Sequence, residues 1–175
     1  MVVRLQDGRF ARKFNQCSTF GAVLDMVTDR LSTTGLCLIL AVLYRAHTLH
    51  FLALVCLDIG AHWAQMYASL LSKAASHKDV TTCSSPLLRL YYGKRLFMGS
   101  LCVGAEVFYL CLYLLASGPR FARMAQTGLT APGVGKLGGV QALALFAAPF
   151  WALKQVTNLL QGQFAAQRLV AADAK

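Results

Sequence analysis

Residues 20–44 read FGAVLDMVTDRLSTTGLCLILAVLY. This stretch is as long as a helix must be to cross a bilayer, and its second half is apolar. Its first half carries Asp25, Asp29 and Arg30, which a helix facing lipid would not tolerate. The charges must face the interior of a helix bundle or a watery cavity. The stretch therefore predicts a membrane-spanning helix that carries a functional site.

The composition of the whole chain agrees with a membrane protein. The chain has 175 residues, of which 57% are hydrophobic and 14% charged, and its mean hydropathy is +0.52. That leaves too little polar surface for an ordinary soluble domain. We expect an all-α, polytopic transmembrane helix bundle in which residues 1–175 form a single membrane domain. The first residues lack the apolar core of a cleavable signal peptide.

Four apolar stretches are each near the length that a bilayer requires. They lie at about residues 20–44, 49–71, 96–116 and 137–160. We expect a short turn at 45–50, a polar loop at 73–95 and a glycine-rich connection before the last span, in which Pro149 predicts a kink. The tail after Gln161 predicts a short helix on the membrane surface.

The basic residues indicate orientation and partners. The formal net charge is +10, but the cations fall between apolar segments and form no stripe with interleaved aromatic residues, so we expect no nucleic-acid partner. Anionic membrane lipids are the favoured partners. Because the predicted loop at 73–95 and both termini hold most of these cations, the positive-inside rule places them in the cytoplasm. The six cysteines have neither disulfide nor zinc spacing and are interpreted as reduced thiols.

Acidic residues near the N-terminus have a spacing that indicates a metal site. Gly21, Asp25 and Asp29 recur every four residues, so on a helix they share one face. Two bare carboxylates one turn apart repel, whereas a bound divalent cation removes the repulsion. Asp7 is followed by Gly8, which leaves room for a ligand to approach the backbone.

Further along, Arg12 adds a guanidinium group suited to phosphate. Together these residues give the pattern D-G-x2-A-R-x8-G-x3-D-x3-D from Asp7 to Asp29. This pattern resembles the signature of the CDP-alcohol phosphatidyltransferases. The resemblance implies two divalent cations, Mg²⁺ or Mn²⁺, that grip the diphosphate of a CDP-linked lipid. It also implies a homodimer whose subunits have about six spans.

The resemblance assigns a role to each matching residue. It implies that the metal ligands are Asp7, Asp25 and Asp29, and that Asp29 is also the catalytic base that takes a proton from the incoming alcohol. The CDP-diacylglycerol site would consist of Asp7, Gly8, Ala11, Arg12, Gly21 and Asp25.

Other segments are similar to the eukaryotic phosphatidylinositol synthases within this family. These are residues 20–30, Leu57-Asp58 with His62-Trp63, residues 76–78 and residues 86–92. The similarity implies CDP-diacylglycerol as donor, myo-inositol as acceptor, and an endoplasmic reticulum membrane with the active site facing the cytoplasm. The inositol contacts would be sought first at His77, Lys78 and Arg89.

One position departs from the family pattern. Arg4 stands where the signature has its first Asp, and relatives carry a span and a hairpin before the motif. We therefore expect a truncated product, an alternative start or an incorrectly predicted gene model of an active enzyme. Two alternatives remain open: a catalytically impaired form that acts as a non-enzymatic membrane partner, and an enzyme that uses another alcohol, such as glycerol phosphate or serine.

Three further features have less specific interpretations. Asp58 and His62 are predicted either to form a hydrogen-bonded pair that ties two spans together or to contribute to the substrate pocket. Glu106 has no evident partner in the sequence. The G-x-G-x-x-G match at residues 133–138 follows no predicted strand and is interpreted as a loop.

Overall fold

The computed structural model describes residues 13–14, 18–71, 85–125 and 137–174. The regular elements in these ranges are all helices. They are α2 (Thr19–Leu43), the short 3-10 helix η1 (Arg45–His47), α3 (Thr48–Leu71), α4 (Pro86–Gly93), α5 (Arg95–Ala125) and α6 (Leu137–Asp173). Helices α2, α3, α5 and α6 contain four segments long and apolar enough to cross a membrane. The predicted all-α, polytopic bundle is thereby confirmed, and the chain is a multi-pass membrane protein.

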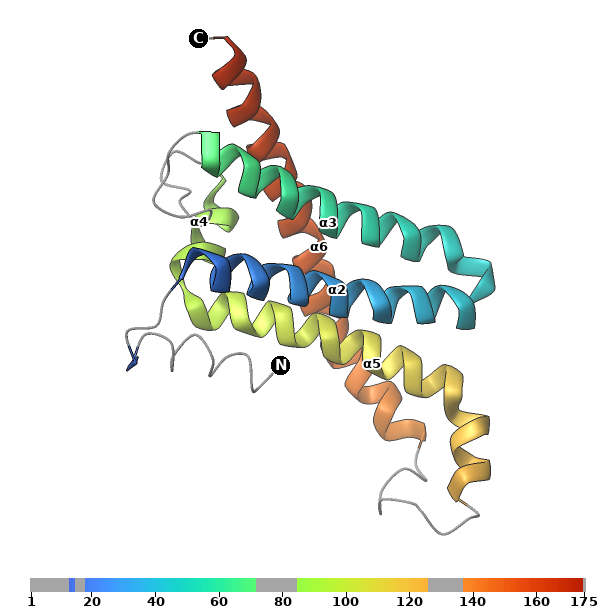
Figure 1. Cartoon of the computed structure of the whole chain (residues 1–175). Helices are drawn as coiled ribbons and strands as arrows, with labels where there is room; N and C mark the ends of the chain where they lie inside the picture. Colours follow the sequence, from blue (N-terminus) through green and yellow to red (C-terminus); the bar gives the residue numbers. More distant parts are fainter. Residues whose placement is uncertain (1–12, 15–17, 72–84, 126–136, 175) are drawn as a thin grey trace.

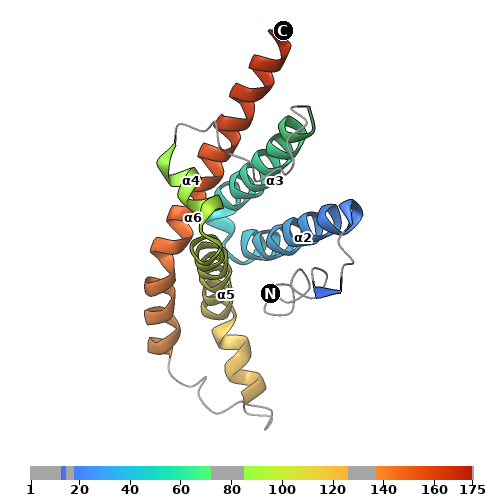
Figure 2. The same ribbon diagram turned by 90° about the vertical axis from the view of Figure 1, so that its left-hand side faces the viewer.

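The four long helices pack against one another. Helices α2 and α3 form an antiparallel hairpin around η1, and α5 lies on the other side of α2 in Figure 1. Helix α6 crosses behind this layer and contacts both α3 and α5, as the rotated view in Figure 2 also shows. The interior of the bundle is therefore bounded by all four long helices.

Both ends of α2 are fixed by hydrogen bonds from polar side chains. At its start, the Ser18 hydroxyl accepts a hydrogen bond of 3.0 Å from the backbone N–H of Gly21, which satisfies one of the unpaired donors of the first turn. After its end, the Tyr44 hydroxyl donates to the backbone carbonyl of Leu112 on α5 at 2.8 Å. These contacts set the position of the helix that carries Asp25 and Asp29.

Apolar side chains fill one half of the bundle and also cover its outside. The buried cluster comes from α2, α3 and α5 and includes Leu40, Phe51 and Tyr109. Large apolar side chains such as Val42 and Leu145 are exposed, at 69% and 77%. An apolar exterior suits lipid rather than water, because exposing apolar side chains to water costs free energy and exposing them to acyl chains does not.

Two segments differ from the prediction. The expected polar loop at 73–95 contains helix α4, which begins with Pro86 in its first turn, a favourable place for proline. The tail is not a separate surface helix: α6 continues through Pro149 and past Gln161 to Asp173. The two differences have one cause, since Leu88 of α4 packs against Phe164 of α6 and buries both side chains.

The close approach of α5 and α6 depends on Gly104. A Cβ atom added there would overlap the Phe150 side chain, whereas one added at Gly99 on the same helix would meet nothing within 4 Å. We expect Gly104→Ala to lower the unfolding free energy by about 1–3 kcal/mol through overpacking, and Gly99→Ala to leave it unchanged or slightly raised. Unfolding in mixed micelles measures both. Equal stabilities for the two variants would show that this crossing is not tight.

Candidate functional site

The predicted acidic residues of α2 lie where the sequence placed them. Asp25 and Asp29 are one turn apart in the N-terminal half of the helix; Asp25 is exposed and Asp29 half-buried. The Thr33 hydroxyl donates to the backbone carbonyl of Asp29 at 3.2 Å. Two carboxylates at this spacing form a donor set that fits a hard divalent cation.

This pair alone does not complete a metal site. Among the residues that the structure describes, no group of three or more His, Cys, Asp or Glu side chains is close enough to hold a metal ion. Gly21 lies in the first turn of α2, and Arg89 lies on the exposed side of α4. The remaining predicted site residues are outside the described ranges; they are Asp7, Gly8, Ala11, Arg12, His77 and Lys78, together with Arg4.

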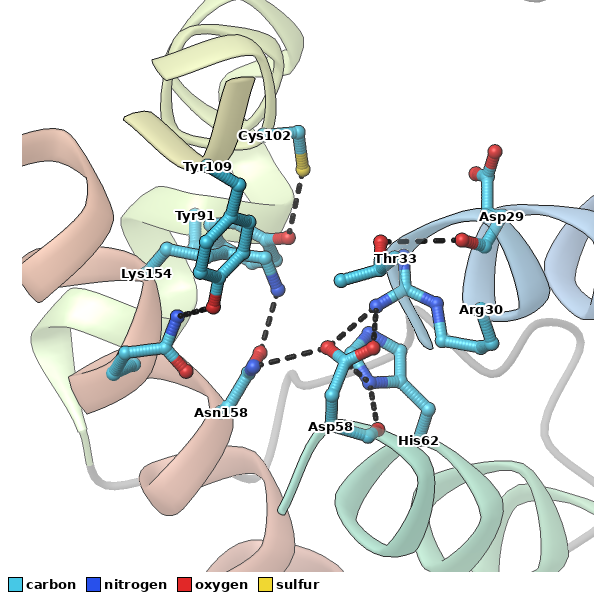
Figure 3. Close-up of polar contacts among 11 residues, drawn as sticks. Asp29, Arg30, Thr33, Asp58, His62, Tyr91, Cys102, Tyr109, Lys154 and Asn158 are labelled. Carbon is cyan, nitrogen blue, oxygen red and sulfur yellow. Dashed lines mark hydrogen bonds and ion pairs between the residues drawn. The ribbon is translucent and has the colours of Figure 1, made fainter. Parts of the chain in front are cut away.

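Directly after Asp29, Arg30 forms an ion pair inside the bundle. Its Nη1 atom lies 2.6 Å from Oδ1 and 2.7 Å from Oδ2 of Asp58 on α3. The Asp58 side chain is 8% exposed and that of Arg30 is 19% exposed. Figure 3 shows Arg30 directed toward Asp58, while the Asp29 carboxylate points away from it. The adjacent residues Asp29 and Arg30 of α2 therefore point into two separate polar regions.

Helix α6 extends this ion pair into a network. The Asn158 amide Nδ2 donates to Oδ1 of Asp58 at 3.1 Å, and its Oδ1 accepts from the Lys154 ammonium at 2.5 Å. Lys154 and Asn158 are 5% and 1% exposed. The network therefore joins α2, α3 and α6 through groups that would be costly to bury singly.

The predicted pair of Asp58 and His62 forms within one helix. The Nδ1 atom of His62 lies 2.7 Å from the backbone carbonyl of Asp58 and 3.7 Å from its Oδ1, so this pair does not itself join two spans, and that part of the prediction is wrong. A carbonyl only accepts, so Nδ1 carries the proton in this contact. The cross-links between helices come instead from Arg30 and Asn158.

Helix α4 covers the network from one side. Lys154 Nζ lies 5.4 Å from the centre of the Tyr91 ring, within the range of a cation–π interaction. The Tyr91 hydroxyl is 3.6 Å from Sγ of Cys102 on α5. Burial raises the pKa of Tyr91 well above its ordinary value, so its hydroxyl stays protonated.

A small cavity lies beside the network. It has a volume of about 40 Å³, and Arg30, Asp58, Lys154 and Asn158 form part of its wall with Thr33 of α2 and Glu106 of α5. At about 10–15 Å³ for each water, this space admits roughly three. All four long helices contribute to it or to its apolar lining, which includes Leu54 and Ala105.

Sequence reasoning missed the cross-helix network but had a signal for it. Lys154 and Asn158 are one turn apart in an otherwise apolar span, and intramembrane charges face a bundle interior by default. The pattern marks these residues as inward-facing. It does not say that they meet Asp58, because that contact joins residues 100 positions apart.

Comparison with known proteins shows which family this chain resembles. Residues 2–83 match the family model described as CDP-alcohol phosphatidyltransferase. The chain is 48% identical over 167 residues to the "Probable CDP-diacylglycerol--inositol 3-phosphatidyltransferase 2" of Arabidopsis thaliana, covering 95% of this chain and 72% of that protein.

Relatives with lower identity carry the same enzyme name. The CDP-diacylglycerol--inositol 3-phosphatidyltransferase of Saccharomyces cerevisiae is 40% identical, with 97% of this chain and 70% of the relative covered. The human protein of that name is 37% identical, with 96% and 74% covered. No solved structure matches the chain significantly.

Proposed function

The chain belongs to the CDP-alcohol phosphatidyltransferase family, and from this premise we propose that it is a CDP-diacylglycerol–inositol 3-phosphatidyltransferase. It transfers the phosphatidyl group of CDP-diacylglycerol to myo-inositol and releases CMP. The observation that carries the proposal is similarity over 95% of the chain to a relative named for this reaction. The acidic face of α2 supports it, because a diphosphate donor requires cations and the cations require carboxylates.

In this reaction Asp29 acts as the general base. It accepts the proton of an inositol hydroxyl while the hydroxyl oxygen attacks the phosphorus that bears diacylglycerol. The new P–O bond forms as the bond from that phosphorus to the CMP oxygen breaks, and CMP leaves with the electron pair. Because phosphoryl transfer needs little covalent help from a protein, positioning and charge stabilisation supply most of the rate enhancement.

Two divalent cations, Mg²⁺ or Mn²⁺, would be held by Asp25 and Asp29 of α2 together with Asp7, which lies outside the described residues. Cations bound there would neutralise the diphosphate oxygens and the charge on departing CMP. The CDP end of the donor would be bound by Gly21 together with Gly8, Ala11 and Arg12, which lie outside the described residues. We place this site at the cytoplasmic face of the endoplasmic reticulum membrane, in a homodimer that is surrounded by anionic lipids.

The choice of acceptor tests this proposal. Purified chain in lipid nanodiscs receives CDP-diacylglycerol, Mg²⁺ or Mn²⁺, and one of inositol, serine or glycerol 3-phosphate, and the lipid products are identified by mass. We expect a phosphatidyl product with inositol and none with the other two. Product with serine or glycerol 3-phosphate in place of inositol would assign a different acceptor.

Removal of metal tests the role of the carboxylates. We expect chelation with EDTA to lower the rate at least about 100-fold, because the cations supply several kcal/mol of charge stabilisation, and Mg²⁺ or Mn²⁺ in excess to restore it. Nucleotide release is followed as CMP. An unchanged rate after chelation and dialysis would contradict the assignment of Asp25 and Asp29 as metal ligands.

A further inference from the structure

The cavity beside the Arg30–Asp58 pair has more hydrogen-bonding capacity than its own residues use. The Nε atom of Arg30 is buried and has no hydrogen-bond partner within the described residues. Lys154 has three N–H donors; its ammonium group donates one hydrogen bond to Asn158 and lies over the Tyr91 ring. Buried donors are expected to be paired, and both residues line the cavity, so hydroxyl or water oxygens there are suitable acceptors.

The charges around the cavity are balanced in sign. Its charged lining consists of two basic side chains, Arg30 and Lys154, and two acidic ones, Asp58 and Glu106. A neutral ligand with hydroxyl groups both donates and accepts hydrogen bonds, and it adds no charge to such a wall. An anionic ligand would have to enter beside two carboxylates in a desolvated site, which is unfavourable.

The cavity borders the helix that carries the proposed base. Thr33, which lines the cavity, is four residues along α2 from Asp29, a rise of about 6 Å along the helix axis. A six-membered ring with hydroxyls on opposite sides has a similar length. The cavity's volume of about 40 Å³ matches a few hydroxyl groups and not a whole ring.

We propose that this cavity receives one edge of the neutral polyol acceptor, and that Lys154 and Glu106 are specificity-determining residues that bind its hydroxyls. The rest of the ring, with the reacting hydroxyl, then lies outside the cavity, toward the N-terminal half of α2 that carries Asp29. In this arrangement Asp58 and Asn158 are positioning residues, because Asp58 holds Arg30, and Asn158 holds Lys154, through hydrogen bonds. The inference rests on the proposed function and assigns the acceptor half of the site to α5 and α6.

Steady-state kinetics with the full chain in nanodiscs tests the assignment. Lys154→Met and Glu106→Gln are compared with wild type and with Lys94→Met, a control at an exposed position after α4. Loss of one hydrogen bond to a charged group is expected to raise the KM for inositol about 10- to 100-fold. The KM for CDP-diacylglycerol should stay within about twofold in both variants, since the donor binds elsewhere on α2.

A second readout separates specificity from a general structural effect. Glu106→Gln leaves the cavity wall with an excess of positive charge, so the ratio of rates with inositol 1-phosphate and inositol should increase. Folding of each variant is judged by size-exclusion chromatography. If Lys154→Met does not fold, the ratio of rates measured with Glu106→Gln still tests the acceptor site.

The outcomes are distinct. A selective rise in the KM for inositol, with the shifted ratio, supports the acceptor site. If the wild-type chain uses inositol and Glu106→Gln changes neither the KM for inositol nor the ratio of rates, the acceptor-site inference is wrong. The proposed function is then unaffected. Wild type that forms no product with any alcohol would overturn the proposed function, and the inference with it.

Discussion

Asp29→Asn is expected to lower kcat by about 100- to 10,000-fold, the range typical of removing a general base. The amide is nearly the same size as the carboxylate but cannot accept the acceptor's proton, and it is a poorer ligand for a hard cation. The half-buried position of Asp29 on α2 suits both tasks. Initial rates of CMP release at saturating CDP-diacylglycerol and inositol measure the loss.

A matched variant controls for the change of charge. Asp173→Asn removes a carboxylate at the exposed end of α6, far along the chain from the proposed site, and should retain the wild-type rate. The assignment of Asp29 as base fails if Asp29→Asn keeps more than a tenth of the wild-type kcat while its KM values are unchanged.

The second large effect concerns stability. Asp58→Leu leaves Arg30 as an uncompensated charge inside the bundle, and removing one partner of a buried ion pair typically costs about 3–5 kcal/mol. The pair is short, at 2.6 Å, and its side chains are 19% and 8% exposed, so little of the cost is relieved by water. Equilibrium unfolding in mixed micelles measures the change.

The double variant Arg30→Met with Asp58→Leu separates the pair from its surroundings. Replacing both charges by apolar groups of similar volume is often close to neutral, so the double variant should recover most of the stability that Asp58→Leu loses. Part of the loss will remain, because Asn158 also donates to Asp58. A double variant as unstable as the single one would show that Arg30 is not the main partner of Asp58.

The sequence predicted the helical architecture well because its signals were local. Each span is an apolar run of bilayer length, and the four-residue spacing of Gly21, Asp25 and Asp29 places them on one face of a helix. Both features depend on short stretches of chain, so no knowledge of the packing was needed. The metal and nucleotide roles of these residues stay predictions.

The parts that were missed depend on contacts between distant segments. Arg30 meets Asp58 across 28 positions, and Asp58 meets Asn158 across 100. No periodicity in one helix reveals which inward-facing charge on another helix it will meet. The continuation of α6 past Gln161 was missed for a related reason, since it packs against Leu88 of α4 through Phe164.

The main consequence for function is that neighbouring residues of α2 are assigned to different substrates. Asp25 and Asp29 are proposed to serve the donor diphosphate, while the next residue, Arg30, faces the interior network that borders the cavity. One helix thereby links the two substrates of the proposed reaction.

The most direct test of the central claim follows both products of one reaction. The purified chain is given CDP-diacylglycerol, labelled myo-inositol and Mn²⁺ or Mg²⁺, beside an Asp29→Asn control. The proposed transfer predicts that labelled phosphatidylinositol and CMP form in equal amounts with the wild-type chain, and that the control forms neither at a comparable rate. CMP release without labelled lipid, or equal product from the control, would contradict phosphatidyl transfer to inositol at this site.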